Sequence, residues 1–121
     1  RYGASRVDFY LECGSRRILL EVKGCTLEVN GEGYFPDAPT ERGVKHLYEL
    51  AAACGAGFDC YLAFVIAIPG VNMVHPNWEM HPEFGAALEE ARQAGVRVLY
   101  LPCQVQEDGL QILEREKGEQ V

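Results

Sequence analysis

Two acidic residues and a lysine near the start of the chain have the types and the spacing of a divalent-metal site. Asp8 lies in one strand-like segment, and Glu21 and Lys23 lie in another, beyond a turn at Gly14-Ser15. Glycine at the first central position suits a two-residue type II′ turn, and this turn pairs Asp8 with Glu21. Directly opposed residues on one face have Cβ atoms about 4.5–5.5 Å apart. We therefore expect two carboxylates to meet, with Lys23 on the same face.

The chemistry of this cluster follows from the repulsion between the two acids. Two ionised carboxylates about 5 Å apart repel by about 3 kcal/mol at an effective dielectric constant near 20. A fold that holds Asp8 and Glu21 together usually supplies a cation or raises the pKa of one of them. Oxygen ligands suit Mg²⁺ or Mn²⁺, and Lys23 adds an ammonium group, so the set fits metal-assisted phosphodiester cleavage. The alternative is a solvated sheet face of mixed charge, and the spacing alone leaves both interpretations open.

The same register gathers the apolar side chains of the hairpin on its opposite face. A shift of one residue would bury the charged side chains instead, so we expect the core to fix this register. The residues that we expect to be buried on this face are Val7, Phe9, Leu11, Ile18, Leu20 and Val22.

The remainder of the chain alternates helix and strand signals, which is typical of an α/β domain. Thr40 and Gly55 have the residue types of a helix start and a helix stop, and Pro82 and Gly95 do the same for a second helix. The apolar run that begins at Asp59 has the composition of a central strand covered on both faces. In chain order we expect a hairpin turning at 14–15, a loop within 24–39, a helix over 40–54, a strand over 59–68, a loop over 69–81, a helix from 82 up to 95, a strand over 96–101 and a short hairpin turning at 107–109. This order predicts a mixed sheet with helices packed against it.

Length and composition indicate a single domain over residues 1–121. A chain of this size buries about two-thirds of its unfolded surface, which is enough for a core of its own. Its longest apolar run, Cys60 to Pro69, is shorter than the roughly 20 residues that a membrane helix needs, so we expect no membrane contact. The five cysteines lack zinc-site spacing, and reduced thiols fit a cytoplasmic location. We interpret Cys54 and Cys60 as core residues.

The distribution of charge along the chain indicates which half could contact a nucleic acid. The net charge of −7 argues against bulk electrostatic attraction to phosphates. Residues 1–60 have a net charge of −2, whereas residues 61–121 have a net charge of −5. Any face that contacts nucleic acid should therefore belong to the first half of the chain.

Three blocks of sequence, in order along the chain, resemble the sugar fermentation stimulation protein A (SfsA) family. The blocks are YGASRVDF at 2–9, EVKGCTL at 21–27 and FPDAPTERGVKHL at 35–47. The resemblance implies an α/β, restriction-endonuclease-like fold, in which a mixed β-sheet is flanked by helices and carries a PD-(D/E)XK nuclease-like site. Family members usually also have an N-terminal OB-like domain, which would be missing from this chain. They are described as DNA-binding proteins linked to the regulation of sugar use in bacteria.

The resemblance also implies roles for individual residues. Asp8 and Glu21 match the two metal-binding acids of the family, and Lys23 matches the lysine that orients or activates the attacking water. The backbone carbonyl of Val22 would be a further ligand of the Mg²⁺ or Mn²⁺ ion.

Four further residues are candidates for contacts with DNA phosphates. Lys45 and His46 match a Lys-His pair of the family on the helix that follows, where a cation could hold a phosphate. A solvated lysine and a histidine that packs on Leu50 explain this pair equally well. Arg6 and Arg42 are candidates of the same kind.

The leading hypothesis is a domain that binds DNA and hydrolyses its phosphodiester bonds with Mg²⁺ or Mn²⁺. One alternative is a non-catalytic DNA-binding regulator of sugar-utilisation genes. Another is a module whose acidic second half binds a protein partner. We interpret His75 and His81 as surface or capping groups rather than as metal ligands. The DNA structure recognised and the oligomeric state stay open.

Overall fold

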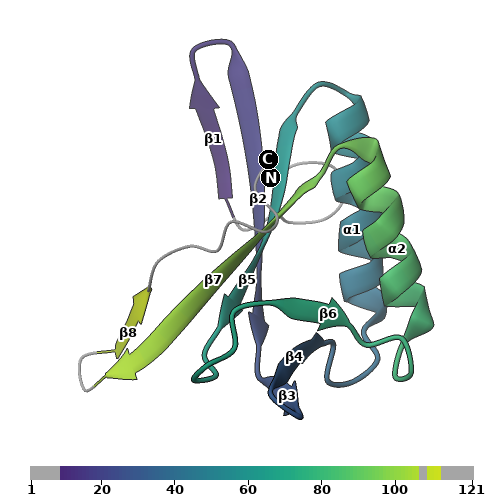
Figure 1. The fold of residues 1–121 in the computed structure, drawn as a ribbon. Coiled ribbons are helices and arrows are strands. Elements are labelled where there is room, and N and C mark those ends of the chain that lie inside the picture. The colour runs from purple at the N-terminus through teal and green to yellow at the C-terminus, as the bar shows by residue number, and fades with distance from the viewer. Residues whose placement is uncertain (1–8, 107–108, 113–121) are drawn as a thin grey trace.

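The computed structural model describes residues 9–106 and 109–112, which form two β-sheets and a pair of helices (Figure 1). The elements are β1 (Phe9–Cys13), β2 (Arg16–Cys25), β3 (Leu27–Val29), β4 (Glu32–Phe35), α1 (Glu41–Gly55), β5 (Asp59–Ile66), β6 (Val74–Pro76), α2 (Pro82–Ala94), β7 (Arg97–Gln106) and β8 (Gly109–Ile112). The expected α/β fold class, a mixed sheet with flanking helices, is confirmed. Neither α1 nor α2, the helices of the described chain, has the length and apolarity to span a bilayer.

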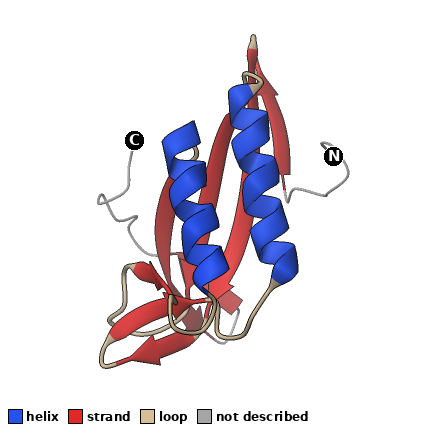
Figure 2. Ribbon diagram, turned by 90° about the vertical axis from the view of Figure 1, so that its right-hand side faces the viewer, coloured by secondary structure: helices blue, strands red, loops and turns tan. Residues whose placement is uncertain are grey.

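The larger sheet has the strand order β1-β2-β5-β7-β8. Strands β2, β5 and β7 are parallel, while β1 and β8 are antiparallel to their neighbours. The chain crosses from β2 to β5 through α1 and from β5 to β7 through α2, each time moving in the same direction across the sheet. Crossovers of this type are almost always right-handed, so both helices come to lie on the same face. Figures 1 and 2 show α1 and α2 side by side on that face.

The hairpin of β1 and β2 has the register that the sequence predicts. Phe9 pairs with Leu20 and Leu11 pairs with Ile18, and Gly14 in the turn has a φ of 64°. The expected pairing of Asp8 with Glu21 lies outside the described residues.

The prediction of which hairpin face is buried is wrong for the described residues. Phe9 and Leu11 are 54% and 55% exposed, whereas Leu19, on the opposite face, is 0% exposed. The other described members of the expected buried set, Ile18, Leu20 and Val22, are only half-buried, and Val7 lies outside the described residues. The cause is the topology: both helices pack on the Leu19 face, so that face of the sheet becomes the core.

Both predicted helices are confirmed, and Thr40, Pro82 and Gly95 stand at their ends as expected. The expected stop at Gly55 is wrong, because α1 includes Gly55 and is capped at Ala56. The Thr40 hydroxyl oxygen accepts a hydrogen bond of 2.9 Å from the backbone N–H of Gly43 at the start of α1. Helix α2 begins at Pro82 and stops at Gly95, whose φ of 113° is in the left-handed region that favours glycine. The buried side chains that the helices contribute to the core include Leu47, Leu50 and Ala53 from α1 and Phe84, Ala87, Leu88 and Ala91 from α2.

A smaller sheet with the order β3-β4-β6 stands where the sequence predicts mostly loops. Asn30 and Gly31, with φ values of 54° and 84°, link β3 to β4 by a tight turn. The Asn-Gly pair is a hairpin signal, and it could have revealed β4. Strand β6 pairs with β4 in parallel, which no local pattern indicates. Phe35 at the end of β4 joins this sheet to the core, because its ring centroid lies 5.5 Å from that of Phe64 and 5.1 Å from that of Phe84.

The one-sided core predicts different costs for adjacent leucines of β2. Leu19→Ala should lower the free energy of unfolding by about 3 kcal/mol, because it empties a fully buried site. Leu20→Ala, at a half-exposed position of the other face, should cost about 1 kcal/mol. Urea unfolding of both variants measures the difference. The opposite order of costs would mean that the core lies on the Leu20 face.

Candidate metal centre

The Glu21 carboxylate is a buried charge between β2 and α1. Its side chain is 4% exposed, and its Oε2 atom lies 3.2 Å from Lys23 Nζ and 3.0 Å from His46 Nδ1. Its Oε1 atom is buried and has no hydrogen-bond partner among the described residues. Two donors therefore share Oε2, whereas no donor of the described residues reaches Oε1.

Strand geometry and helix packing bring these three side chains together. Glu21 and Lys23 are two residues apart in β2, so both point to the face that α1 and α2 cover. His46 comes from α1, next to Leu47, which is 1% exposed and anchors the helix to the core. The strand supplies the acid and the ammonium group, and the helix supplies the imidazole.

The electrostatics of Glu21 favour an additional positive partner. Burial of a carboxylate is costly unless its oxygens receive hydrogen bonds or a cation. Lys23 and His46 offset this cost at Oε2, but no described donor does so at Oε1. A carboxylate oxygen in this situation is a suitable ligand for a hard divalent cation.

The structure brings some of the predicted site residues together and leaves others undescribed. Glu21 and Lys23 are in contact, as expected, whereas Asp8 and Arg6 lie outside the described residues. Within the described ranges, no set of three His, Cys, Asp or Glu side chains is placed to hold a metal ion. The role of Asp8 as a second metal ligand stays a prediction.

The three residues of α1 that are expected to contact phosphates differ in exposure. Arg42 and Lys45 are exposed. His46 instead turns Nδ1 toward Glu21, and its side chain is 16% exposed. Sequence reasoning missed this contact because it depends on how α1 packs against β2, and no local pattern reports that packing.

The two remaining histidines, His75 and His81, each contact a glutamate away from Glu21. His75 in β6 is half-exposed and pairs through Nε2 with Glu32 Oε1, in keeping with the expected surface role. His81 is the N-cap residue of α2, as expected of a capping group, but its side chain makes no capping hydrogen bond, and at 9% exposure it is buried rather than on the surface. Its Nδ1 atom lies 3.1 Å from Glu83 Oε1.

The buried cysteines have the properties of core residues. Burial raises the pKa of the Cys60 thiol to about 12. Burial also raises the pKa of the Cys25 thiol, although that thiol approaches two backbone carbonyls that oppose the shift. Both groups are therefore neutral thiols near pH 7 and poor nucleophiles.

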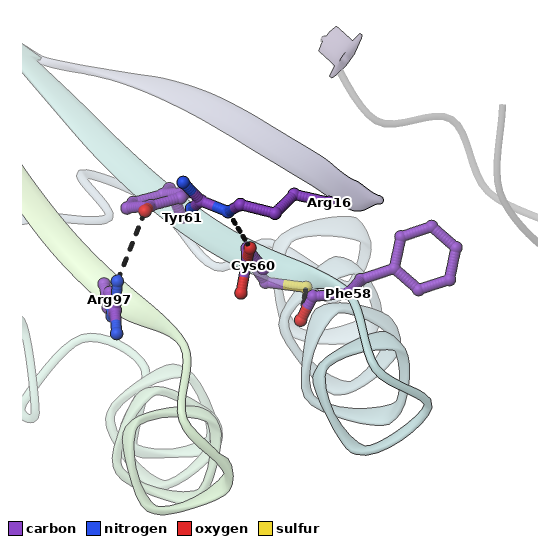
Figure 3. A network of polar contacts seen from close by, with 6 residues as sticks. Arg16, Phe58, Cys60, Tyr61 and Arg97 are labelled. Atoms are coloured by element: carbon purple, nitrogen blue, oxygen red, sulfur yellow. Dashed lines mark hydrogen bonds and ion pairs between the residues drawn. The ribbon is translucent and has the colours of Figure 1, made fainter. Parts of the chain in front are cut away.

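A separate polar network occupies the opposite face of the sheet (Figure 3). Arg16 Nε lies 2.8 Å from Asp59 Oδ2, and Arg97 donates a hydrogen bond of 3.3 Å to the Tyr61 hydroxyl. Strand alternation and register place these side chains with Ile18 and Leu20, away from Glu21. The network therefore offers exposed cations that are independent of the candidate metal centre.

Comparison with known proteins shows the family to which this chain belongs. Residues 1–109 match the model of the family described as "Sugar fermentation stimulation protein RE domain". The chain belongs to this SfsA family, and the resemblance seen in the sequence is confirmed.

Two curated relatives and a solved structure illustrate the similarity. Sugar fermentation stimulation protein homologues are 51% identical over 107 residues in Desulfitobacterium hafniense (strain Y51) and 49% identical over 112 residues in Clostridium beijerinckii. These alignments cover 88% and 93% of this chain but 47% and 50% of the relatives. SfsA of Pyrococcus furiosus, solved in complex with Ca²⁺, has a TM-score of 0.87 and 29% identity, over 95% of this chain and 50% of that one. The chain thus spans about half the length of these proteins.

The contact between Glu21 and Lys23 predicts a measurable coupling energy. Glu21→Gln and Lys23→Met should each destabilise the fold by about 1–3 kcal/mol in metal-free buffer, because each leaves a largely buried charge without its partner. The double variant should cost less than the sum of the single variants, by about 1 kcal/mol or more. Urea unfolding of the four proteins gives this coupling.

The control is the same double-mutant cycle on the exposed ion pair of Arg16 and Asp59, whose side chains are 54% and 39% exposed. Its coupling should stay within about 0–1 kcal/mol. Equal couplings in the two cycles would contradict a special role for the buried pair.

Proposed function

We propose that this chain carries a PD-(D/E)XK-type divalent-metal site that hydrolyses phosphodiester bonds of DNA. The observation that carries the proposal is the buried Glu21 carboxylate, which has Lys23 and His46 on one oxygen and no described partner on the other. A carboxylate oxygen without a described donor can bind a cation, and an adjacent ammonium group can stabilise negative charge on a phosphate.

The donor set fits Mg²⁺ or Mn²⁺. Glu21 Oε1 offers a carboxylate ligand, Asp8 would be the second acid, and the backbone carbonyl of Val22 would be a further oxygen ligand. The Pyrococcus furiosus relative, which is 29% identical, was solved with Ca²⁺, another cation that prefers oxygen ligands.

The residues of this chain would hold and orient the reacting groups. When bound, a divalent cation polarises a phosphate oxygen and lowers the pKa of a water molecule. Lys23 of β2 and His46 of α1 both hold Glu21 Oε2, so the direction of Oε1 is fixed as well. Lys23 has three N–H donors, of which one faces Glu21 Oε2. The other two would orient water or stabilise negative charge on the phosphate.

Metal-dependent cleavage tests the proposal directly. The wild-type chain should cut plasmid or oligonucleotide DNA with Mg²⁺ or Mn²⁺ and not with EDTA. Asp8→Ala and Glu21→Gln should each reduce the rate by at least about 100-fold, because each removes a metal ligand. Glu90→Gln, at an exposed position of α2, removes the same kind of charge and should leave the rate unchanged.

The outcomes of this experiment separate the candidate functions. DNA binding without cleavage under any metal would favour the non-catalytic regulator. Absence of both would favour the protein-interaction module. Cleavage that survives in Asp8→Ala and Glu21→Gln would place the active site elsewhere or reveal a contaminating nuclease.

The DNA-binding face of the proposal lies on α1. Arg42 and Lys45 are exposed on the helix that also carries His46 to Glu21. Phosphates held by these cations would therefore lie on the side of the sheet that carries the candidate metal centre. Arg6 is a further candidate from the same half of the chain.

Replacement of Arg42 and Lys45 together by Ala should weaken DNA binding for all sequences. The slope of log K against log salt should become shallower by up to about 2, because each lost phosphate contact removes roughly 0.9 of a counterion term. The matched control is the double replacement of Arg16 and Arg97 by Ala, which removes two cations from the opposite face (Figure 3). Fluorescence anisotropy across a salt series measures both. Equal effects of the two double variants would show that α1 is not the binding face.

A further inference from the structure

We propose that His46 is a positioning residue, which fixes the Glu21 carboxylate so that Oε1 is the oxygen presented to the metal. This inference rests on the proposed function. The His46 Nδ1 atom lies 3.0 Å from Glu21 Oε2, and the two side chains are 16% and 4% exposed. The interaction joins residues 25 positions apart, so it exists only when α1 is docked on β2.

The pattern of donors on Glu21 explains why an imidazole is needed. A carboxylate can exchange its two oxygens by rotation about its terminal bond, and its terminal torsion is broad. Lys23 is attached to the same strand as Glu21 through a flexible four-carbon stem, so it can follow such a rotation. His46 approaches from the helix on a short, rigid side chain. A second donor from a separate element therefore holds Oε2 in place and directs Oε1 away from both donors.

In this role, the contact with Glu21 also excludes His46 Nδ1 as a metal ligand. The proposed role requires the tautomer in which Nδ1 carries the hydrogen and donates it to Oε2, because an ionised carboxylate only accepts hydrogen bonds. A protonated Nδ1 has no lone pair and cannot itself be a metal ligand. Metal-binding groups in proteins are commonly oriented by such outer partners, and loss of the partner typically weakens metal binding by 10–100-fold. His46 would stand in this relation to Glu21.

Helix packing supplies the rigidity that this role requires. Leu47 and Leu50, the neighbours of His46 on the core side of α1, are each 1% exposed. Rotation or sliding of α1 would therefore disturb the core, and the imidazole has little freedom to leave Glu21. The packed core therefore restricts the Glu21 carboxylate through its hydrogen bond with His46.

Mn²⁺ affinity of the chain, measured by isothermal titration calorimetry, separates positioning from simple packing. His46→Asn keeps an N–H donor near the place of Nδ1, whereas His46→Gln places its amide nearer to Nε2 and His46→Leu keeps bulk without a donor. We expect Leu and Gln to weaken Mn²⁺ binding by about tenfold or more, and Asn to stay within about threefold of wild type. Tyr48→Leu, at an exposed site on the same helix, should leave the affinity unchanged.

The results test the role of His46 separately from the existence of the metal site. Binding of Mn²⁺ by wild type that Glu21→Gln abolishes, together with equal affinities in the Asn, Gln and Leu variants, would overturn the role of His46 and leave the metal site intact. Absence of Mn²⁺ binding in wild type would overturn the proposed function itself, and the inference with it. If His46→Leu does not fold, the contrast between Asn and Gln decides, because both are polar and differ in where the donor stands.

Discussion

The burial of one carboxylate, that of Glu21, is the interaction on which the arrangement of the site depends. A charge that is 4% exposed needs partners, and the described chain provides Lys23 from the same strand and His46 from α1. The strand contact would survive a different helix position, but the imidazole contact would not. The site therefore couples the chemistry of β2 to the docking of α1, and the leucines that anchor α1 also support the acid.

The one-sided cover of the sheet explains where this site lies. Two crossovers that proceed in the same direction place α1 and α2 on one face of the sheet (Figure 2). Strand alternation then points the side chains of Leu19, Glu21 and Lys23 toward the helices. An acid on the other face would be more open to water and would have less need of a fixed partner. In this fold the same topology makes the core and sets the charged residues of β2 at its border.

The chain belongs to the SfsA family but corresponds to only part of the length of its relatives. The chain spans about half of the relatives' length, while the Pyrococcus furiosus structure matches it over 95% of its residues. The α/β fold of this chain thus corresponds to about half of the Pyrococcus furiosus protein. Phe9 and Leu11, on the face opposite the helices, also belong to this part, and more than half of each residue is exposed among the described residues.

The sequence by itself determined the elements whose causes are local: the β1–β2 register, the capped helices, the central strand and the contact between Glu21 and Lys23. Turn residues, caps and side-chain alternation act over a few positions, so they can be read directly. Only the tertiary structure decided that Leu19 rather than Leu20 faces the core, that β4 pairs with β6, and that His46 holds Glu21. Those features depend on the direction of the crossovers and on how α1 packs, and both arise from contacts between residues far apart in the chain.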